Sequence, residues 1–251
     1  MTPLLPWQWA LLVVGSVFVG MAKTGLAGLG TLFIAIFASV LPTKQATGMV
    51  LPLLIFGDCV AVAAYRQHAQ WSQLIRLFPW AGAGVVAGYF ALNHIDNSQA
   101  RLLVGATILV LLCLHVWSRS RAAALLDRWK EEGPPTPLVI ATGFVAGFTT
   151  LVANAAGPLM TIYLLALRLP KMNFLGTAAI YFLLLNLFKV PFMVDLGLID
   201  MSSFKVNLIL APAVGIGGLA GRFLVHRINQ KWFERVTLAL TAVAGVKLVF
   251  F

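Results

Sequence analysis

The sequence has few charged residues. Asp, Glu, Lys and Arg together make up 10% of its 251 residues, whereas 60% are hydrophobic. A soluble domain carries about 25% charged residues, so this chain cannot cover a water-exposed surface with polar side chains. Apolar runs of roughly 20 residues, the length of a helix that crosses a bilayer, recur along the chain. The sequence therefore predicts an all-α polytopic membrane protein that contacts the lipid bilayer.

The sequence also lacks a cluster of metal ligands and a recognisable enzyme motif. The two cysteines, Cys59 and Cys113, both lie inside apolar runs, so we expect neither a disulfide framework nor a metal site. No H-E-x-x-H, G-x-S-x-G or P-loop motif occurs. Acidic residues number 8 against 18 Lys and Arg. We assign this basic excess to membrane topology rather than to nucleic-acid binding, and we expect no cofactor and no enzyme activity.

Two sets of apolar segments flank one polar stretch. They occupy 7–22, 25–41, 45–65, 72–92 and 98–118, then 138–152, 155–168, 174–194, 204–224 and 234–251. We predict a first membrane repeat over 1–118, a cytoplasmic linker over 119–137 and a second membrane repeat over 138–251. Glycine and proline recur at matching positions of the two halves: Gly20 with Gly147, Gly30 with Gly157, Pro42 with Pro170, Gly48 with Gly176, and Pro79, Gly82, Gly84 and Gly88 with Pro212, Gly215, Gly217 and Gly221.

The positions of Lys and Arg predict the topology. Four stretches hold most of them and are assigned to the cytoplasm. These are Arg66 and Arg76; Arg119, Arg121, Arg128 and Lys130; Arg168 and Lys171; and Arg222, Arg227, Lys231 and Arg235. The loops 93–99 and 195–200 contain no Lys or Arg and are assigned to the outside.

This topology predicts two re-entrant hairpins. Segment 138–168 lies between two cytoplasmic loops and therefore makes no net crossing, so we expect two half-helices with a tip near Asn154. By the same reasoning 7–41 is a hairpin that enters from outside, with its tip near 23–28. Each repeat then has one hairpin and three transmembrane helices, the second repeat is inverted, and both termini lie outside. Inverted repeats with broken helices are a recurrent transporter architecture.

Both predicted tips combine helix-breaking residues with polar ones. The first reads GMAKTGLAGLGTL from Gly20 to Leu32, and the second reads GFTTLVANAAGPL from Gly147 to Leu159. We expect the second half-helices to begin at Leu26 and at Ala155, with their N-termini directed inward to form an anion site. The alternative is that these small residues only allow close helix packing. The candidate substrate-binding residues are Lys23, Thr24, Gly25, Gly28, Thr149, Thr150, Asn154, Ala155 and Gly157, with Gly30 beside them.

Each candidate polar side chain also has a purely structural interpretation. Lys23 could give its charge to an anion, or it could snorkel or form a structural ion pair. Asn154, Thr149 and Thr150 could donate hydrogen bonds to an oxyanion, or they could cap the hairpin.

Two further charges lie at depth in predicted spans, Asp58 and Lys189. Asp58 aligns with Asn186, which is one helical turn from Lys189 and shares a face with it. The favoured interpretation is that Asp58 and Lys189 neutralise each other. The alternative is that Asp58 carries a coupling proton while Lys189, with Asn186, meets the substrate.

At its two tips the chain resembles the sulfite exporter TauE/SafE family of bacterial membrane proteins. The family has two repeats that each open with G-x-x-x-G, further glycines and a proline, and here GSVFVGMAKTGLAGLG and GFVAGFTTLVANAAGP hold those places. Family members commonly carry a G-G-G run where this chain has AGLG and NAAG. The resemblance implies a multi-pass carrier of small sulfur anions, such as sulfite or sulfoacetate, in the bacterial inner membrane.

Three functions follow from these observations. The favoured one is a secondary transporter that moves a small sulfur-containing anion by alternating access, with protons as a candidate coupling ion. The second is an anion channel in which the tips form a filter. The third is a membrane-embedded enzyme or scaffold. The sequence sets neither the direction of transport nor the oligomeric state.

Overall fold

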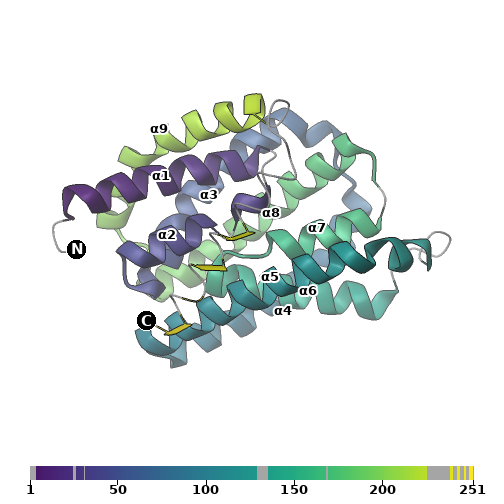
Figure 1. Ribbon diagram of the computed structural model, residues 1–251, viewed down its shortest axis with the longest axis horizontal. Coiled ribbons are helices and arrows are strands. Elements are labelled where there is room, and N and C mark those ends of the chain that lie inside the picture. Colours follow the sequence, from purple (N-terminus) through teal and green to yellow (C-terminus); the bar gives the residue numbers. More distant parts are fainter. Residues whose placement is uncertain are drawn as a thin grey trace.

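The structure is a computed structural model that describes residues 4–24, 27–30, 32–128, 135–167 and 169–224, with scattered positions between 238 and 250. Every element within the continuous ranges is a helix (Figure 1). Five of these helical stretches are long and apolar enough to cross a membrane: Thr43–His68, Trp71–His94, Thr136–Ala153, Met172–Asp195 and Met201–Leu224. The predicted class, an all-α membrane protein, is confirmed. Most of the predicted segment 234–251 lies outside the described residues.

The helices recur in a similar order of lengths in the two halves. The first half contains α1 (Pro6–Lys23), η1 (Ala27–Gly30), α2 (Leu32–Val40), α3 (Thr43–Tyr65), η2 (Arg66–His68), α4 (Trp71–His94) and α5 (Asn97–Arg128). The second contains α6 (Thr136–Ala153), α7 (Gly157–Ala166), α8 (Lys171–Asp195) and α9 (Met201–Leu224). Prolines precede or open several of these helices. The proline ring fixes φ near the helical value, and the N–H that proline lacks would have no partner within the first turn of a helix. Such prolines are Pro6, Pro42, Pro135 and Pro170.

The two segments predicted as re-entrant hairpins contain helices of unequal length, and α6, expected as a half-helix, is long enough to cross a membrane. The re-entrant hairpins stay a prediction. α1 and α6 each have 18 residues, about 27 Å at 1.5 Å per residue. α2 and α7 have only 9 and 10 residues. The second helix of each hairpin also begins later than expected, at Leu32 and Gly157 rather than at Leu26 and Ala155. In the first tip the glycine-rich stretch 27–30 forms a 3-10 turn instead of the start of an α-helix, because glycine is a poor helix former.

α5 extends into the predicted cytoplasmic linker. The helix ends at Arg128, so 119–128 is helical rather than part of a loop. This stretch is rich in alanine, leucine and arginine, which favour helix, and the first glycine and prolines follow only at 133–135. The stretch 129–134 lies outside the described residues.

Two helix pairs form opposite edges of the molecule, α1 with α9 and α4 with α6, and α3 packs on α8 between them (Figure 1). Glycines let the edge helices touch. A Cβ on Gly20 would overlap the carbonyl oxygen of Val214, and a Cβ on Gly147 would overlap that of Ala81. Gly20 matches Gly147, and with Pro79 aligned on Pro212, Ala81 falls opposite Val214. These matched contacts are what a duplication would produce; the division into two inverted repeats stays a prediction.

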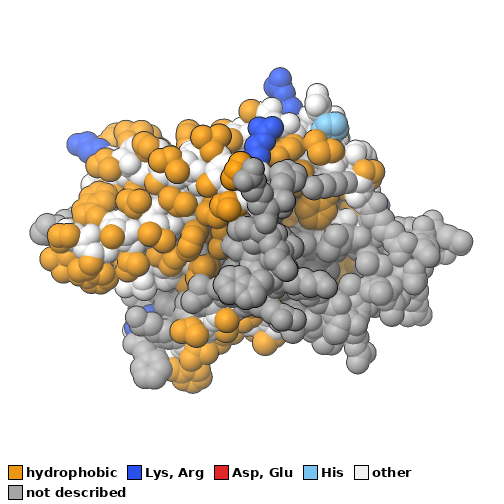
Figure 2. Space-filling view, turned by 45° about the horizontal axis from the view of Figure 1, so that its top comes forward, with side chains coloured by type: hydrophobic (Ala, Val, Ile, Leu, Met, Phe, Trp, Pro, Cys, Tyr) orange, Lys and Arg blue, Asp and Glu red, His pale blue; other side chains and the backbone are white. Residues whose placement is uncertain are grey.

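The outer surface of the described helices is apolar. Large hydrophobic side chains such as Ile75, Phe90, Leu208 and Leu219 are 70%, 54%, 60% and 74% exposed. Figure 2 shows one face on which hydrophobic side chains cover most of the described surface. A protein in water rarely exposes such extended apolar area, so this surface fits contact with lipid.

Candidate functional site

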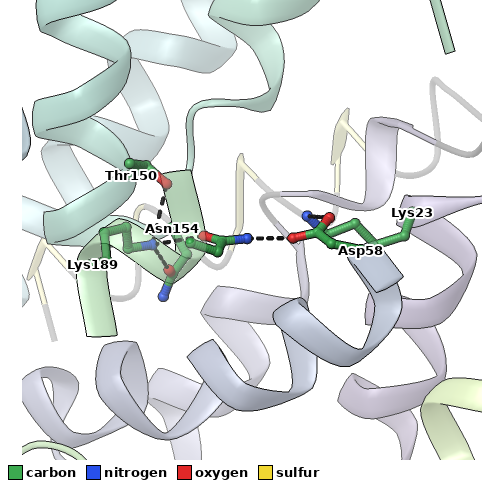
Figure 3. A network of polar contacts seen from close by, with 6 residues as sticks. Lys23, Asp58, Thr150, Asn154 and Lys189 are labelled. Atoms are coloured by element: carbon green, nitrogen blue, oxygen red, sulfur yellow. Dashed lines mark hydrogen bonds and ion pairs between the residues drawn. The ribbon is translucent and has the colours of Figure 1, made fainter. Parts of the chain in front are cut away.

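The first tip supplies a lysine that pairs with the acidic residue of α3. Lys23, the last residue of α1, places Nζ 2.6 Å from Oδ1 of Asp58 (Figure 3). The side chains of Lys23 and Asp58 are 13% and 1% exposed. The ammonium of Lys23 also lies 4.6 Å from the ring centroid of Phe182 on α8. A carboxylate buried this deeply needs a compensating partner, and Lys23 provides it.

Asn186 links this ion pair to a second buried lysine. Its Nδ2 donates to Oδ2 of Asp58 over 2.6 Å, and its Oδ1 accepts from Nζ of Lys189 over 3.1 Å. An ammonium group can only donate, so the amide oxygen must face Lys189 and the amide nitrogen must face the carboxylate. Lys189 therefore fixes the orientation of the Asn186 amide, and through it one oxygen of Asp58.

Lys189 is fully buried and surrounded by neutral oxygens. Besides Asn186, its Nζ donates to Oδ1 of Asn154 over 2.6 Å and to Oγ1 of Thr150 over 3.3 Å. Three oxygens thus converge on one nitrogen, which is the arrangement that solvates an ammonium ion in place of water. Thr150 and Asn154 come from the second tip, so Lys189 ties α8 to the end of α6.

The favoured sequence interpretation of Asp58 and Lys189 as a directly neutralising pair differs from what the structure shows. The ionic partner of Asp58 is Lys23, and Asn186 stands between Asp58 and Lys189. The physical reason is geometric. Asn186 and Lys189 share a helical face, and the shorter amide fills the space next to the carboxylate.

The second tip turns at Asn154. This residue has φ 48° and ψ 31°, the left-handed conformation that asparagine tolerates better than most residues. Its amide oxygen is held by Lys189, so its Nδ2 points the other way and donates to the carbonyl oxygen of Thr47 over 2.8 Å. Asn154 therefore both shapes the tip and connects it to the N-terminal part of α3.

A cavity of about 140 Å³ adjoins this polar network. One water needs about 10–15 Å³ measured in this way, so the cavity can hold a small solute together with water. Lys23, Asp58, Thr150, Asn154 and Asn186 form its polar wall. Much of the remaining wall is apolar and leads toward the end of α3 and the start of α8, with Tyr65, Met160, Leu164, Phe174, Leu175 and Ala178.

The matched glycines Gly30 and Gly157 line the cavity, one from each tip. No atom lies within 4 Å of the position that a Cβ would take on either of them. The interpretation that small residues only serve close packing therefore holds for Gly20 and Gly147, but not for Gly30 and Gly157. At these two positions the missing side chain leaves open space beside the backbone. η1 also contacts α7, so the two tips meet as the sequence predicts.

Several predicted residues do not reach the cavity. Thr24 faces Gly218 and Gly221 of α9, and its Oγ1 donates to the carbonyl oxygen of Gly20 on α1 over 3.1 Å. Thr149 donates to the carbonyl oxygen of Val145 over 2.8 Å. Ala155 is buried, and Lys189 lies behind the polar wall rather than in it. Gly25 lies outside the described residues, and Gly28 is described only as part of the backbone of η1.

Sequence reasoning did not single out most of the apolar wall of the cavity. It also missed two other lining residues, Phe182 near the polar groups and Thr161, which carries a hydroxyl. Thr161 and Tyr163 carry the two hydroxyls of the otherwise apolar helix α7, and that contrast is a usable signal for Thr161. Phe182 is one of several phenylalanines of α8, and no sequence pattern distinguishes the one that lies beneath an ammonium group.

A family model described as Sulfite exporter TauE/SafE matches residues 12–248 of the chain. The chain belongs to this family. No curated protein and no solved structure matches it. Membership of the TauE/SafE family, together with the five apolar helical stretches, makes the chain a multi-pass membrane protein of a transporter family whose substrates are small sulfur-containing anions.

Proposed function

We propose that this TauE/SafE protein is a secondary transporter of the bacterial inner membrane. It moves a small sulfur-containing anion, such as sulfite, sulfoacetate or a related organosulfonate, by alternating access. The observation that carries this proposal is that Lys23, at one hairpin tip, lines a small cavity whose opposite wall is the other tip. Lys23 is only 13% exposed, beside a cavity that can hold a small solute. A lysine at such depth is a functional feature in a membrane protein, since it is costly there.

The cavity offers several favourable contacts to an oxyanion. The ammonium of Lys23 supplies a charge-assisted hydrogen bond, which is stronger than a neutral one. Thr150 and Thr161, which carry hydroxyls, line the same space. Gly157 begins α7, so the positive end of that helix dipole faces the cavity. The open space at Gly30 and Gly157 lets the anion approach the backbone.

The closed outer side favours a carrier over a channel. Toward the loops assigned to the outside, the start of α3 is held by neighbouring segments. Lys44 donates through Nζ to the carbonyl oxygen of Ile95 over 2.9 Å. A Cβ on Gly48 would come within 2.5 Å of Leu198, and the carbonyl oxygen of Thr47 is occupied by Asn154. The apolar wall instead leads to the loops assigned to the cytoplasm. We infer an inward-facing state of an alternating-access cycle.

Aligned glycines of the two halves make similar contacts, and this supports an exchange between inward-facing and outward-facing states. Gly48 meets Leu198 after α8, and the aligned Gly176 meets Tyr65 and Ala69 after α3. Two inverted repeats can exchange such arrangements, which would close the inner side and open the outer one. Asp58 lines the cavity and is available to carry a coupling proton during this exchange.

The test is a flux screen in proteoliposomes that contain the purified full-length chain. Sulfite, sulfate, thiosulfate, sulfoacetate and acetate are compared, with and without a pH gradient. We expect saturable uptake of at least one sulfur anion. Flux that does not saturate would favour the channel, and no flux of any of these anions would contradict the proposal. Response of the flux to the pH gradient tests proton coupling separately.

A further inference from the structure

The charges around the cavity can be counted from the described residues. Lys23 is positive, Asp58 is negative, and the two are in contact. Lys189 lies behind Asn154 and Asn186 and is counted as an ammonium ion, whose Nζ donates to three neutral oxygens. The network therefore holds one positive charge in excess.

We propose that this network selects singly charged anions and that Asp58 sets the selection. This inference rests on the proposed function of the cavity and narrows its substrates to monoanions such as hydrogensulfite. Sulfoacetate, which carries a carboxylate besides its sulfonate, would be selected against. A monoanion in the cavity brings the sum of Lys23, Asp58, Lys189 and substrate to zero. A dianion leaves one uncompensated negative charge inside the protein, where like charges repel far more strongly than in water.

Asp58 lies where its carboxylate acts on the charge of the substrate itself. Its carboxylate lines the same cavity as Lys23, so any anion that reaches the ammonium also lies near the carboxylate. Asn186 holds the second carboxylate oxygen, which restrains Asp58 from turning away. A doubly charged substrate therefore meets about twice the repulsion that a singly charged one meets.

Two ligands of nearly equal shape separate the charge effect from size. Methanesulfonate is a monoanion, and sulfate is a dianion in which an oxygen stands in place of the methyl group. The measurement is the dissociation constant of each ligand for the purified full-length chain, by isothermal titration calorimetry. We expect the wild type to bind methanesulfonate at least about tenfold more tightly than sulfate, as Coulomb's law implies for one extra charge at protein dielectric.

Asp58→Asn should shift the ratio of the two dissociation constants toward sulfate by about tenfold to a hundredfold. The matched control is the double variant Lys23→Gln with Asp58→Asn, which restores the charge excess of one. It should bind both ligands more weakly than the wild type yet keep the wild-type preference. A purely structural role of Asp58 would weaken both ligands alike and leave the ratio unchanged.

The possible outcomes distinguish the charge selection, the role of Asp58 in it and the proposed function of the cavity. Wild-type protein that binds sulfate as tightly as methanesulfonate overturns the selection, whether or not the variants fold. A folded Asp58→Asn protein with an unchanged ratio removes Asp58 from that role. If sulfite, methanesulfonate and sulfate all fail to bind, the proposed function of the cavity is the claim that fails.

Discussion

Removal of Lys23 should destabilise the protein mainly through Asp58. The variant Lys23→Met keeps the length of the side chain but leaves a carboxylate that is 1% exposed without its cation. Breaking a buried ion pair by removal of one partner costs about 3–5 kcal/mol, because the remaining charge is uncompensated. Asp58→Asn should cost less, since Lys23 is 13% exposed and lies next to the cavity.

The double variant Lys23→Met with Asp58→Asn should recover most of that loss. Asparagine still accepts a hydrogen bond from Asn186, and no unpaired charge remains. We therefore expect a coupling free energy of about 2–3 kcal/mol between the two sites, within the range of contacting residues. The assay is reversible unfolding in mixed micelles, followed by tryptophan fluorescence, on the wild type, both single variants and the double variant.

The matched control replaces Lys189, which is fully buried. Lys189→Met combined with Asp58→Asn should show weaker coupling, because Asn186 separates these two residues. If the effects of Lys23→Met and Asp58→Asn simply add, or if Lys189 couples to Asp58 more strongly than Lys23 does, our assignment of the ion pair is wrong.

Three further predictions concern the architecture. Gly147→Ala should prevent stable folding, because the new Cβ would overlap the carbonyl oxygen of Ala81, whereas Gly30→Ala should fold. An equal fall in the thermal unfolding temperature of the two variants would contradict the packing argument. Asn154→Ala should be less stable than Asn154→Gly by about 1 kcal/mol, since both lose the amide but only alanine is strained at φ 48°; unfolding free energies that rank the other way would refute this. The backbone N–H of Ser203 and the hydroxyl of Ser202 lower the pKa of Asp200, so its stabilising effect is present above the unfolded pKa of about 4 and is lost as pH falls through the folded pKa. Asp200→Ala should therefore lower the unfolding temperature at pH 7, and this difference should shrink at acid pH; a difference that is independent of pH would show that the carboxylate charge is irrelevant.

The sequence predicts the fold class and the location of the tips because these depend on strong local signals. Long apolar runs define the spans, and the glycines and prolines near 20–32 and 147–159 interrupt them. The extent of α5 is harder to predict, since 119–128 combines helix-forming residues with charges that suggest a loop.

The side-chain partners within the site could be predicted only in part. Lys23 and Asp58 are both singled out by their charge at depth, but the pairing depends on how α1, α3 and α8 are placed in space. Helical periodicity shows that Asn186 and Lys189 share a face; it does not show which of them meets the carboxylate. Likewise Thr24 and Lys23 are neighbours in sequence, and only the packing of α1 against α9 turns Thr24 away from the cavity.

The central claim is that the substrate passes through the cavity between the two tips. The most direct measurement is counterflow of isotope-labelled sulfite or sulfoacetate, whichever the flux screen identifies, into proteoliposomes. Gly157→Val would narrow the cavity at a position where a Cβ meets open space, because no atom lies within 4 Å of that Cβ. Gly215→Val, at a position that is equally open but does not line this cavity, is the matched control. We predict counterflow in the wild type and in Gly215→Val, and its loss in Gly157→Val. Full counterflow in a folded Gly157→Val protein would contradict the claim.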